Sequence, residues 1–156
     1  MSAHILHAGS LDAPAMAAVH KKGFAHAWDE GALRNLMDKP NCLTLAAFEP
    51  PRKLVGFIMT RQASDECEVL TIVSASKKRR AGIGTSLLTH AVELSRQQGA
   101  NRMFLEVASG NKAAISLYKK HGFEEISRRV GYYRQGNNAP EDAPEDALVM
   151  AKQLDA

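Results

Sequence analysis

The sequence predicts a mixed α/β domain in which helices flank a mostly antiparallel sheet. Its 156 residues, 45% apolar and 24% charged, have the balance of an ordinary globular protein, so we expect a single domain over residues 1–156. Three consecutive strand patterns before residue 75 predict an antiparallel meander. The strand–helix–strand pattern of residues 67–108 then implies a right-handed crossover between two parallel strands of that sheet.

The first elements are a short strand and two helices. The strand is expected at residues 4–8. A helix follows over residues 12–24, because Asp12 can cap it and a proline lies in its first turn. A second helix is expected over residues 29–38, and it ends before Pro40, which cannot continue a helix.

Strands dominate the middle of the chain. Two of them, at residues 42–49 and 53–61, flank a double-proline turn, and a more buried third covers residues 67–74. Apolar residues then recur at helical spacing over residues 83–98, and another strand is expected at residues 102–108.

The last part of the chain predicts one helix and a closing strand pair. Asn111 can cap the helix and Gly122 can end it. Strands are expected at residues 124–133 and 146–154. The segment between them, residues 134–147, repeats P-E-D-A in tandem without an apolar face, so we expect a mobile hairpin loop there.

Composition excludes several function classes. The formal charge of +3 and the pI near 9.0 are too mild to indicate nucleic acid without a concentrated patch. Cys42 and Cys67 do not have metal-ligand spacing and the six histidines show no paired motif, so we expect no metal. No run is apolar and long enough for a membrane span and no leader pattern is seen, which predicts a cytoplasmic protein without a membrane partner.

The segment KKRRAGIGTSLL, residues 77–88, places four cations and two glycines between a strand and a helix. This context suits an anion, because glycines let the backbone approach it and a helix N-terminus favours negative charge. A Walker A loop would need a lysine where Thr85 stands, and a dinucleotide fingerprint would need a third glycine where Leu87 stands. The remaining alternative is a plain turn beside a solvated run of charges.

Three motifs in order resemble the GNAT (GCN5-related N-acetyltransferase) superfamily over nearly the whole chain: R-x-x-G-x-G, then FLEV, then GNKAAISLYKKHGFEE. The resemblance implies a mostly antiparallel sheet with a central parallel pair of strands that splay apart around acetyl-coenzyme A (acetyl-CoA). The pyrophosphate of acetyl-CoA would bind the turn, at Arg79, Arg80, Ala81, Gly82, Ile83, Gly84 and Thr85. Its pantetheine arm would bind the main chain of Ile72, Val73 and Ser74, and Asn111.

Within that superfamily the chain is most similar to bacterial N-terminal alanine acetyltransferases that modify a small-subunit ribosomal protein. Glu106 in FLEV, Asn111 and Tyr118 in GNKAAISLY, and the late GYYRQG…EDALVM carry this likeness. It implies an enzyme that transfers acetyl directly to a protein α-amino group, with that protein N-terminus as its partner. The chain departs from the family toward the acceptor side, at Ser76, Ala108 and Gly110.

The resemblance assigns roles to four side chains, and each has a structural alternative. Glu106 would take a proton from the amine, directly or through a water, or it is only a solvated strand residue. Tyr118 would protonate the departing thiolate, or it is only a core tyrosine. Trp28 would wall the peptide site, or it belongs to the core, and helix capping alone would also explain Asn111.

Two other functions stay open. The same fold could acetylate a lysine or a small-molecule amine, in which case polyamines or free amino acids would be better acceptors than an alanine-starting peptide. A non-catalytic acyl-CoA-binding or ribosome-associated module would bind acetyl-CoA without turnover. The presence of both Glu106 and Tyr118 favours an enzyme over such a module.

Overall fold

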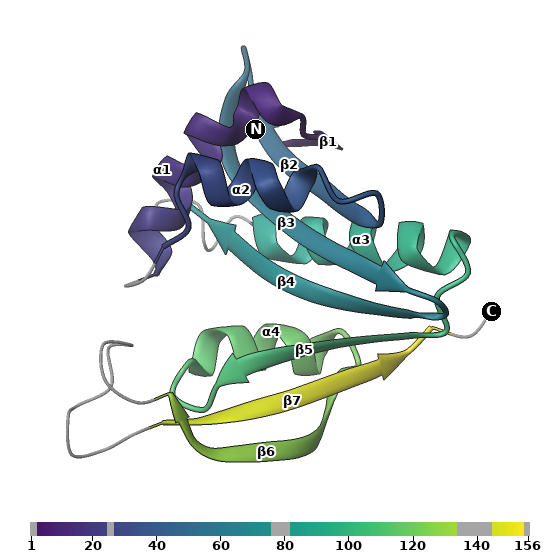
Figure 1. Cartoon of the computed structure of the whole chain (residues 1–156). Coiled ribbons are helices and arrows are strands. Elements are labelled where there is room, and N and C mark those ends of the chain that lie inside the picture. Colours follow the sequence, from purple (N-terminus) through teal and green to yellow (C-terminus); the bar gives the residue numbers. More distant parts are fainter. Residues whose placement is uncertain (1–2, 25–26, 76–81, 134–144, 155–156) are drawn as a thin grey trace.

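Seven strands form one sheet in the computed structural model, which describes residues 3–24, 27–75, 82–133 and 145–154 (Figure 1). The strand order is β1-β2-β3-β4-β5-β7-β6, and every neighbouring pair is antiparallel except β4 and β5. The strands are β1 His4–His7, β2 Cys42–Glu49, β3 Lys53–Ala63, β4 Glu66–Ser74, β5 Arg102–Ala108, β6 Glu124–Tyr133 and β7 Glu145–Gln153. The predicted mixed α/β class, with one parallel pair in a mostly antiparallel sheet, is confirmed.

Helices cover both faces of this sheet (Figure 1). They are α1 Ala13–Gly23, which follows a short 3-10 turn, α2 Glu30–Met37, α3 Ile83–Gln97 and α4 Lys112–Lys120. Two of the helix starts have the predicted caps. The Asp29 carboxylate accepts a hydrogen bond from the Ala32 N–H at 2.8 Å, and the Asn111 side-chain oxygen accepts one from the Ala114 N–H at 3.2 Å.

The two sheet faces carry separate apolar clusters. α3 and α4 pack on one face, where Leu87, Leu88 and Tyr118 meet buried residues of β5 such as Leu105. α1 and α2 pack on the other face, where their apolar residues meet Phe57 of β3. Because β5 and β6 receive no helix on this second face, it is covered over β2 to β4 and open beyond them (Figure 1).

Several boundaries differ from the predicted ones by one residue, and the larger differences are at the end of β3 and in the loop before β7. β3 continues two residues beyond Arg61, to Ala63. β7 begins at Glu145, so the predicted loop over residues 134–147 is wrong in its last three residues. The end of the second P-E-D-A repeat is in the strand because its main chain pairs with both neighbours: Ala147 pairs with Ala108 of β5 and with Arg129 of β6. The Asp146 carboxylate also accepts a hydrogen bond from Arg128 of β6 at 2.9 Å. Residues 134–144 lie outside the described part of the chain.

Candidate active site

β4 and β5 part from one another after a short stretch of pairing. The parallel pairing covers only three residue pairs, the last of which is Glu68 with Phe104, although β4 continues to Ser74 and β5 to Ala108. The parting coincides with a bulge in β4. Val69 and Thr71 pair with consecutive residues of β3, so β4 has one extra residue between them. A bulge bends its strand and increases the local twist, which turns β4 away from β5.

The bulged strand offers main-chain groups on its open side. The Ala75 N–H donates to the Val55 carbonyl at 2.8 Å, which fixes the alternation of the antiparallel pairing with β3. By that alternation the main-chain groups of Val73 point to β3, and those of Ile72 and Ser74 point to the side from which β5 has withdrawn. An amide-bearing ligand could bond to Ile72 and Ser74 like an added strand.

α3 begins at a turn that is open to solvent. Gly82 is its N-cap residue, with a φ of 79°, and a Cβ built on it would have no heavy atom within 4 Å. The first N–H groups of a helix have no partner inside the helix, so those of Ile83, Gly84 and Thr85 can donate to an anion. Arg79, Arg80 and Ala81 lie outside the described residues. Space, free donors and a helix N-terminus fit the pyrophosphate of acetyl-CoA.

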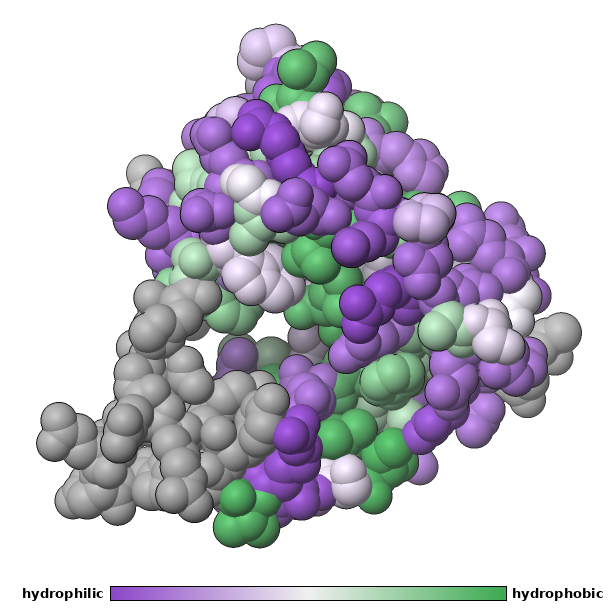
Figure 2. All heavy atoms as spheres, in the orientation of Figure 1, coloured by the Kyte–Doolittle hydropathy of each residue, from purple (hydrophilic) through white to green (hydrophobic). Residues whose placement is uncertain are grey.

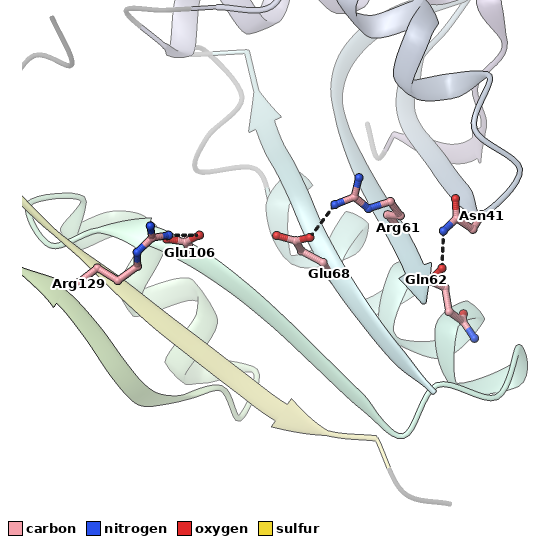
Figure 3. Close-up of polar contacts among 6 residues, drawn as sticks. All are labelled: Asn41, Arg61, Gln62, Glu68, Glu106 and Arg129. Atoms are coloured by element: carbon pink, nitrogen blue, oxygen red, sulfur yellow. Dashed lines mark hydrogen bonds and ion pairs between the residues drawn. The ribbon is translucent and has the colours of Figure 1, made fainter. Parts of the chain in front are cut away.

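Glu106 lies beside the parting strands and carries an ion pair. Its neighbours Leu105 and Val107 are buried toward α3 and α4, so the alternation of β5 turns Glu106 to the opposite face. There both carboxylate oxygens accept hydrogen bonds from Nη1 of Arg129, at 3.1 and 3.2 Å (Figure 3). A second pair, Arg61 with Glu68 at 3.2 Å, lies on the β4 side (Figure 3). The predicted base is thus exposed and charged, but already paired.

Tyr118 is buried in the α4 side of the core. Its residue is 5% exposed and its ring centroid lies 5.8 Å from that of Phe123. Burial raises the pKa of the Tyr118 phenol well above its usual value, so the hydroxyl keeps its proton and can act as a donor. Tyr118 and Glu106 belong to opposite sheet faces, so one substrate can reach both only where β4 and β5 have parted.

The surface is hollowed near this place. Figure 2 shows a hollow between the part of the molecule that carries α1 and α2 and the part that carries β5 to β7. A separate depression of about 310 Å³, lined by Pro40, Cys42 and Gln62 among others, holds none of the predicted site residues. The predicted site residues of β4 and β5 therefore lie along the hollow of Figure 2 and not in this depression.

Asn111 and Trp28 both have the structural roles that the sequence offered as alternatives to ligand binding. Asn111 uses its side-chain oxygen to cap α4, which leaves its amide nitrogen for a ligand. Trp28 is half-buried in the cluster under α1 and α2, and its indole stacks on the ring of His20 at 5.1 Å. Capping and packing are therefore observed, while ligand contacts of Asn111 and Trp28 stay predictions.

Two polar residues near the site were not found from the sequence. Arg129 of β6 reaches Glu106 of β5 across the intervening strand β7. β5 and β6 are not paired with each other, so no local sequence pattern predicts a contact between them. His20 is a packing histidine, 3% exposed, and it is hydrogen-bonded at both ring nitrogens. Its spacing to Phe24 and Trp28, four and eight residues on, was the available signal.

In the part of the chain that the structure describes, no three or more His, Cys, Asp or Glu side chains form a group that could hold a metal ion. Over the same residues, no helix is long and apolar enough to cross a membrane. The prediction of a metal-free site stays a prediction.

The parting of β4 and β5 in front of an open glycine turn agrees with the arrangement that the resemblance to acetyltransferases implies. The chain belongs to the family described as Acetyltransferase (GNAT) family, whose model matches residues 13–123. The predicted family is therefore confirmed, and with it the prediction of an N-acetyltransferase.

Relatives and solved structures agree with this family. The ribosomal protein bS18-alanine N-acetyltransferase of Escherichia coli is 34% identical over 99 residues, and the match spans 64% of either chain. The enzyme of the same name from Salmonella typhimurium is 31% identical over 145 residues, 91% of either chain. A solved structure of the E. coli enzyme has a TM-score of 0.88 at 27% identity, covering 99% of this chain and 95% of that one.

The fold also extends to a eukaryotic protein. Arabidopsis thaliana NAA60, solved in complex with acetyl-CoA, has a TM-score of 0.83 at 18% identity, covering 97% of this chain and 98% of that one. At that identity the likeness is one of fold.

Proposed function

We propose that this chain is an acetyl-CoA-dependent protein N-terminal α-amino acetyltransferase that acts in the cytoplasm on the N-terminal alanine of a small-subunit ribosomal protein. The observation that carries the proposal is the parting of β4 and β5 after Glu68 and Phe104, directly before the open turn at Gly82. The acceptor is inferred from the names of the E. coli and S. typhimurium relatives.

Donor binding would use main-chain groups of β4 and α3. Ile72 and Ser74 would bond to the pantetheine arm, with Val73 between them turned to β3. The pyrophosphate would bind in the turn, at Arg79, Arg80, Ala81, Gly82, Ile83, Gly84 and Thr85. The side-chain nitrogen of Asn111 would bond to the pantetheine arm. When bound, acetyl-CoA supplies a thioester carbonyl that an amine can attack.

The acceptor amine must be neutral to attack. An α-amino group, with a pKa of about 8, loses its proton near neutrality more easily than a lysine at about 10.4. Glu106 would accept that proton, directly or through a water, because its carboxylate lies exposed at the face from which a peptide can arrive. Trp28 would border the peptide on the side of the α1–α2 connection.

Transfer is direct in this proposal. The neutral amine nitrogen would bond to the acetyl carbonyl carbon while the carbon–sulfur bond breaks, and the Tyr118 hydroxyl would give its proton to the sulfur. The proton that the nitrogen then loses would return to the Tyr118 oxygen through water, so Glu106 keeps only the proton taken before the attack. A cysteine intermediate is disfavoured. Burial raises the pKa of the Cys42 thiol, which lowers its thiolate fraction, and Cys67 is buried in the core.

The test is acetylation of an alanine-starting peptide that also contains an internal lysine, with tandem mass spectrometry to locate the label. We expect the acetyl group on the α-amino nitrogen, and no label when that nitrogen is formylated beforehand. Label on the lysine, or faster acetylation of a polyamine, would contradict the proposal and indicate that the acceptor is a lysine or a small-molecule amine. Bound acetyl-CoA without any turnover would establish the non-catalytic module.

A further inference from the structure

His20 is a buried histidine that links three elements. It lies in the third turn of α1, is 3% exposed, and contacts both the α1–α2 connection and β4. The Trp28 N–H lies 3.2 Å from its Nδ1, and the Thr71 hydroxyl oxygen lies 3.1 Å from its Nε2. Both ring nitrogens therefore have a partner inside the protein.

The two partners fix the tautomer of the ring. A backbone N–H can only donate, so Nδ1 of His20 must be the acceptor and carries no proton. In the neutral ring the proton is then on Nε2, which donates to the hydroxyl oxygen of Thr71. Burial lowers the pKa of His20 to about 4, so the ring is neutral near physiological pH and both bonds can form together.

Ring stacking adds to this link. The His20 ring stacks on Phe24 with centroids 4.3 Å apart and on Trp28 with centroids 5.1 Å apart, at interplanar angles of 17° and 9°. The end of α1 also lies against β4, since a Cβ built on Gly23 would come within 2.8 Å of a Val73 methyl carbon. The start of the α1–α2 connection is thus held against the strand from which β5 departs.

We propose that His20 is a positioning residue that sets the acceptor-binding wall at Trp28 against the donor-binding strand β4. This inference rests on the proposed function, in which Trp28 borders the peptide. His20 touches neither reacting group. It acts through the main chain and ring of Trp28 and through the side chain of Thr71.

The link through His20 should affect binding of the acceptor peptide more than binding of acetyl-CoA. The register of β4 is fixed by its pairing with β3 on both sides of Thr71, so it does not depend on the His20 bond. The main-chain groups of Ile72 and Ser74 would keep their positions. The half-buried Trp28, by contrast, has its amide bonded to a side chain and not to another strand or helix turn.

Two amide substitutions separate the two bonds. The oxygen of the asparagine in His20→Asn lies where Nδ1 lies, so it can still accept from the Trp28 N–H. The nitrogen of the glutamine in His20→Gln reaches toward the Nε2 position, so it can donate to Thr71 but leaves the Trp28 N–H without its acceptor. His90→Asn, on the exposed surface of α3, is the control for the same chemical change elsewhere.

Steady-state kinetics give the first measurement, with an alanine-starting peptide and acetyl-CoA varied in turn. We expect His20→Gln to raise the KM of the peptide about tenfold, the effect of losing one buried hydrogen bond. His20→Asn should raise it less, and both should leave the KM of acetyl-CoA and kcat within about twofold of the wild type. Equal rises for both substrates, or equal peptide KM values in the two variants, would overturn the proposal.

The fluorescence of Trp28, the only tryptophan of the chain, gives the second measurement and needs no activity. We expect quenching by acrylamide to increase in His20→Gln and to stay near the wild-type value in His20→Asn and His90→Asn. Unchanged quenching in His20→Gln would refute the link itself. A wild-type protein that acetylates no amine would refute the proposed function, while the quenching experiment would still decide the link.

Discussion

Nη1 of Arg129 lies 3.1 and 3.2 Å from the two carboxylate oxygens of Glu106, and the two side chains meet across β7. The carboxylate proposed as the base is therefore already held by a guanidinium. About a third of the Glu106 side chain stays exposed, so an amine or a water can still approach it. The pair orients the carboxylate on the face of β5 that is open to an acceptor.

We predict that Arg129→Ala lowers kcat about tenfold with little change in the KM of acetyl-CoA, because Glu106 loses the contact that orients it. Arg129→Lys should recover part of the loss, since it keeps the charge but not the two contacts. Initial rates at saturating acetyl-CoA measure this. If Arg129→Ala were faster than the wild type, Arg129 would be a competitor of the acceptor for Glu106.

Glu106 and Tyr118 should give different pH profiles. Glu106→Gln should lose most activity below the pKa of the acceptor amine and recover in part above it, as free amine becomes abundant. Tyr118→Phe should lower kcat by roughly 10²–10⁴-fold without that recovery, because the proton it gives is needed after attack. The raised pKa of Tyr118 keeps its hydroxyl protonated over the whole range measured.

These profiles need folded variants and saturating acetyl-CoA. Tyr118→Phe keeps the ring that packs against Phe123, so a thermal unfolding scan should show little change and serves as the control. Parallel pH profiles, or a fully active Glu106→Gln, would remove Glu106 from the chemistry and leave deprotonation to bulk water.

A negative charge at Gly82 should weaken donor binding. Gly82 has a φ of 79°, a conformation that Asn and Asp tolerate better than other side chains, so Gly82→Asn and Gly82→Asp carry the same backbone cost. We expect Gly82→Asp to bind acetyl-CoA at least about tenfold more weakly than Gly82→Asn, because its carboxylate repels the pyrophosphate at the helix N-terminus. Calorimetry would measure this, and equal affinities would place the anion elsewhere.

The buried His20 should make the fold sensitive to acid. Its pKa is about 4 in the folded chain against 6.5 for an ordinary histidine, so between these values the unfolded chain binds a proton that the folded one does not. Stability therefore falls as pH drops from 6.5 to 4, by about 3 kcal/mol in total for this group. Urea unfolding at several pH values should show a flatter dependence for His20→Asn. Parallel curves for the two proteins would contradict this.

Local patterns were enough for most of the fold. The helix caps Asp29 and Asn111, the strand alternation and the parallel crossover could all be read from neighbours in sequence, and each is observed. The end of the acidic loop could not be predicted, because its last residues pair with distant parts of the chain: Ala147 pairs with Ala108 of β5 and Arg129 of β6. A loop pattern shows a lack of local structure and says nothing of distant partners.

The candidate site was predictable only as a set of positions. The glycine turn and Glu106 stand out by type and spacing, and the structure places both beside the parting of β4 and β5. The Arg129 contact and the tautomer of His20 depend on which strands and helices lie next to each other. Those neighbours follow from tertiary packing, so no local pattern of the sequence predicts them.

The central claim is that this protein acetylates the N-terminus of another protein. Its most direct test is mass spectrometry of protein N-termini from cells with and without the gene, complemented by the wild-type chain or by Tyr118→Phe. We predict that an alanine N-terminus of a small-subunit ribosomal protein is acetylated only in cells that carry the wild-type chain. Identical N-terminal acetylation in all of these cells would contradict the account.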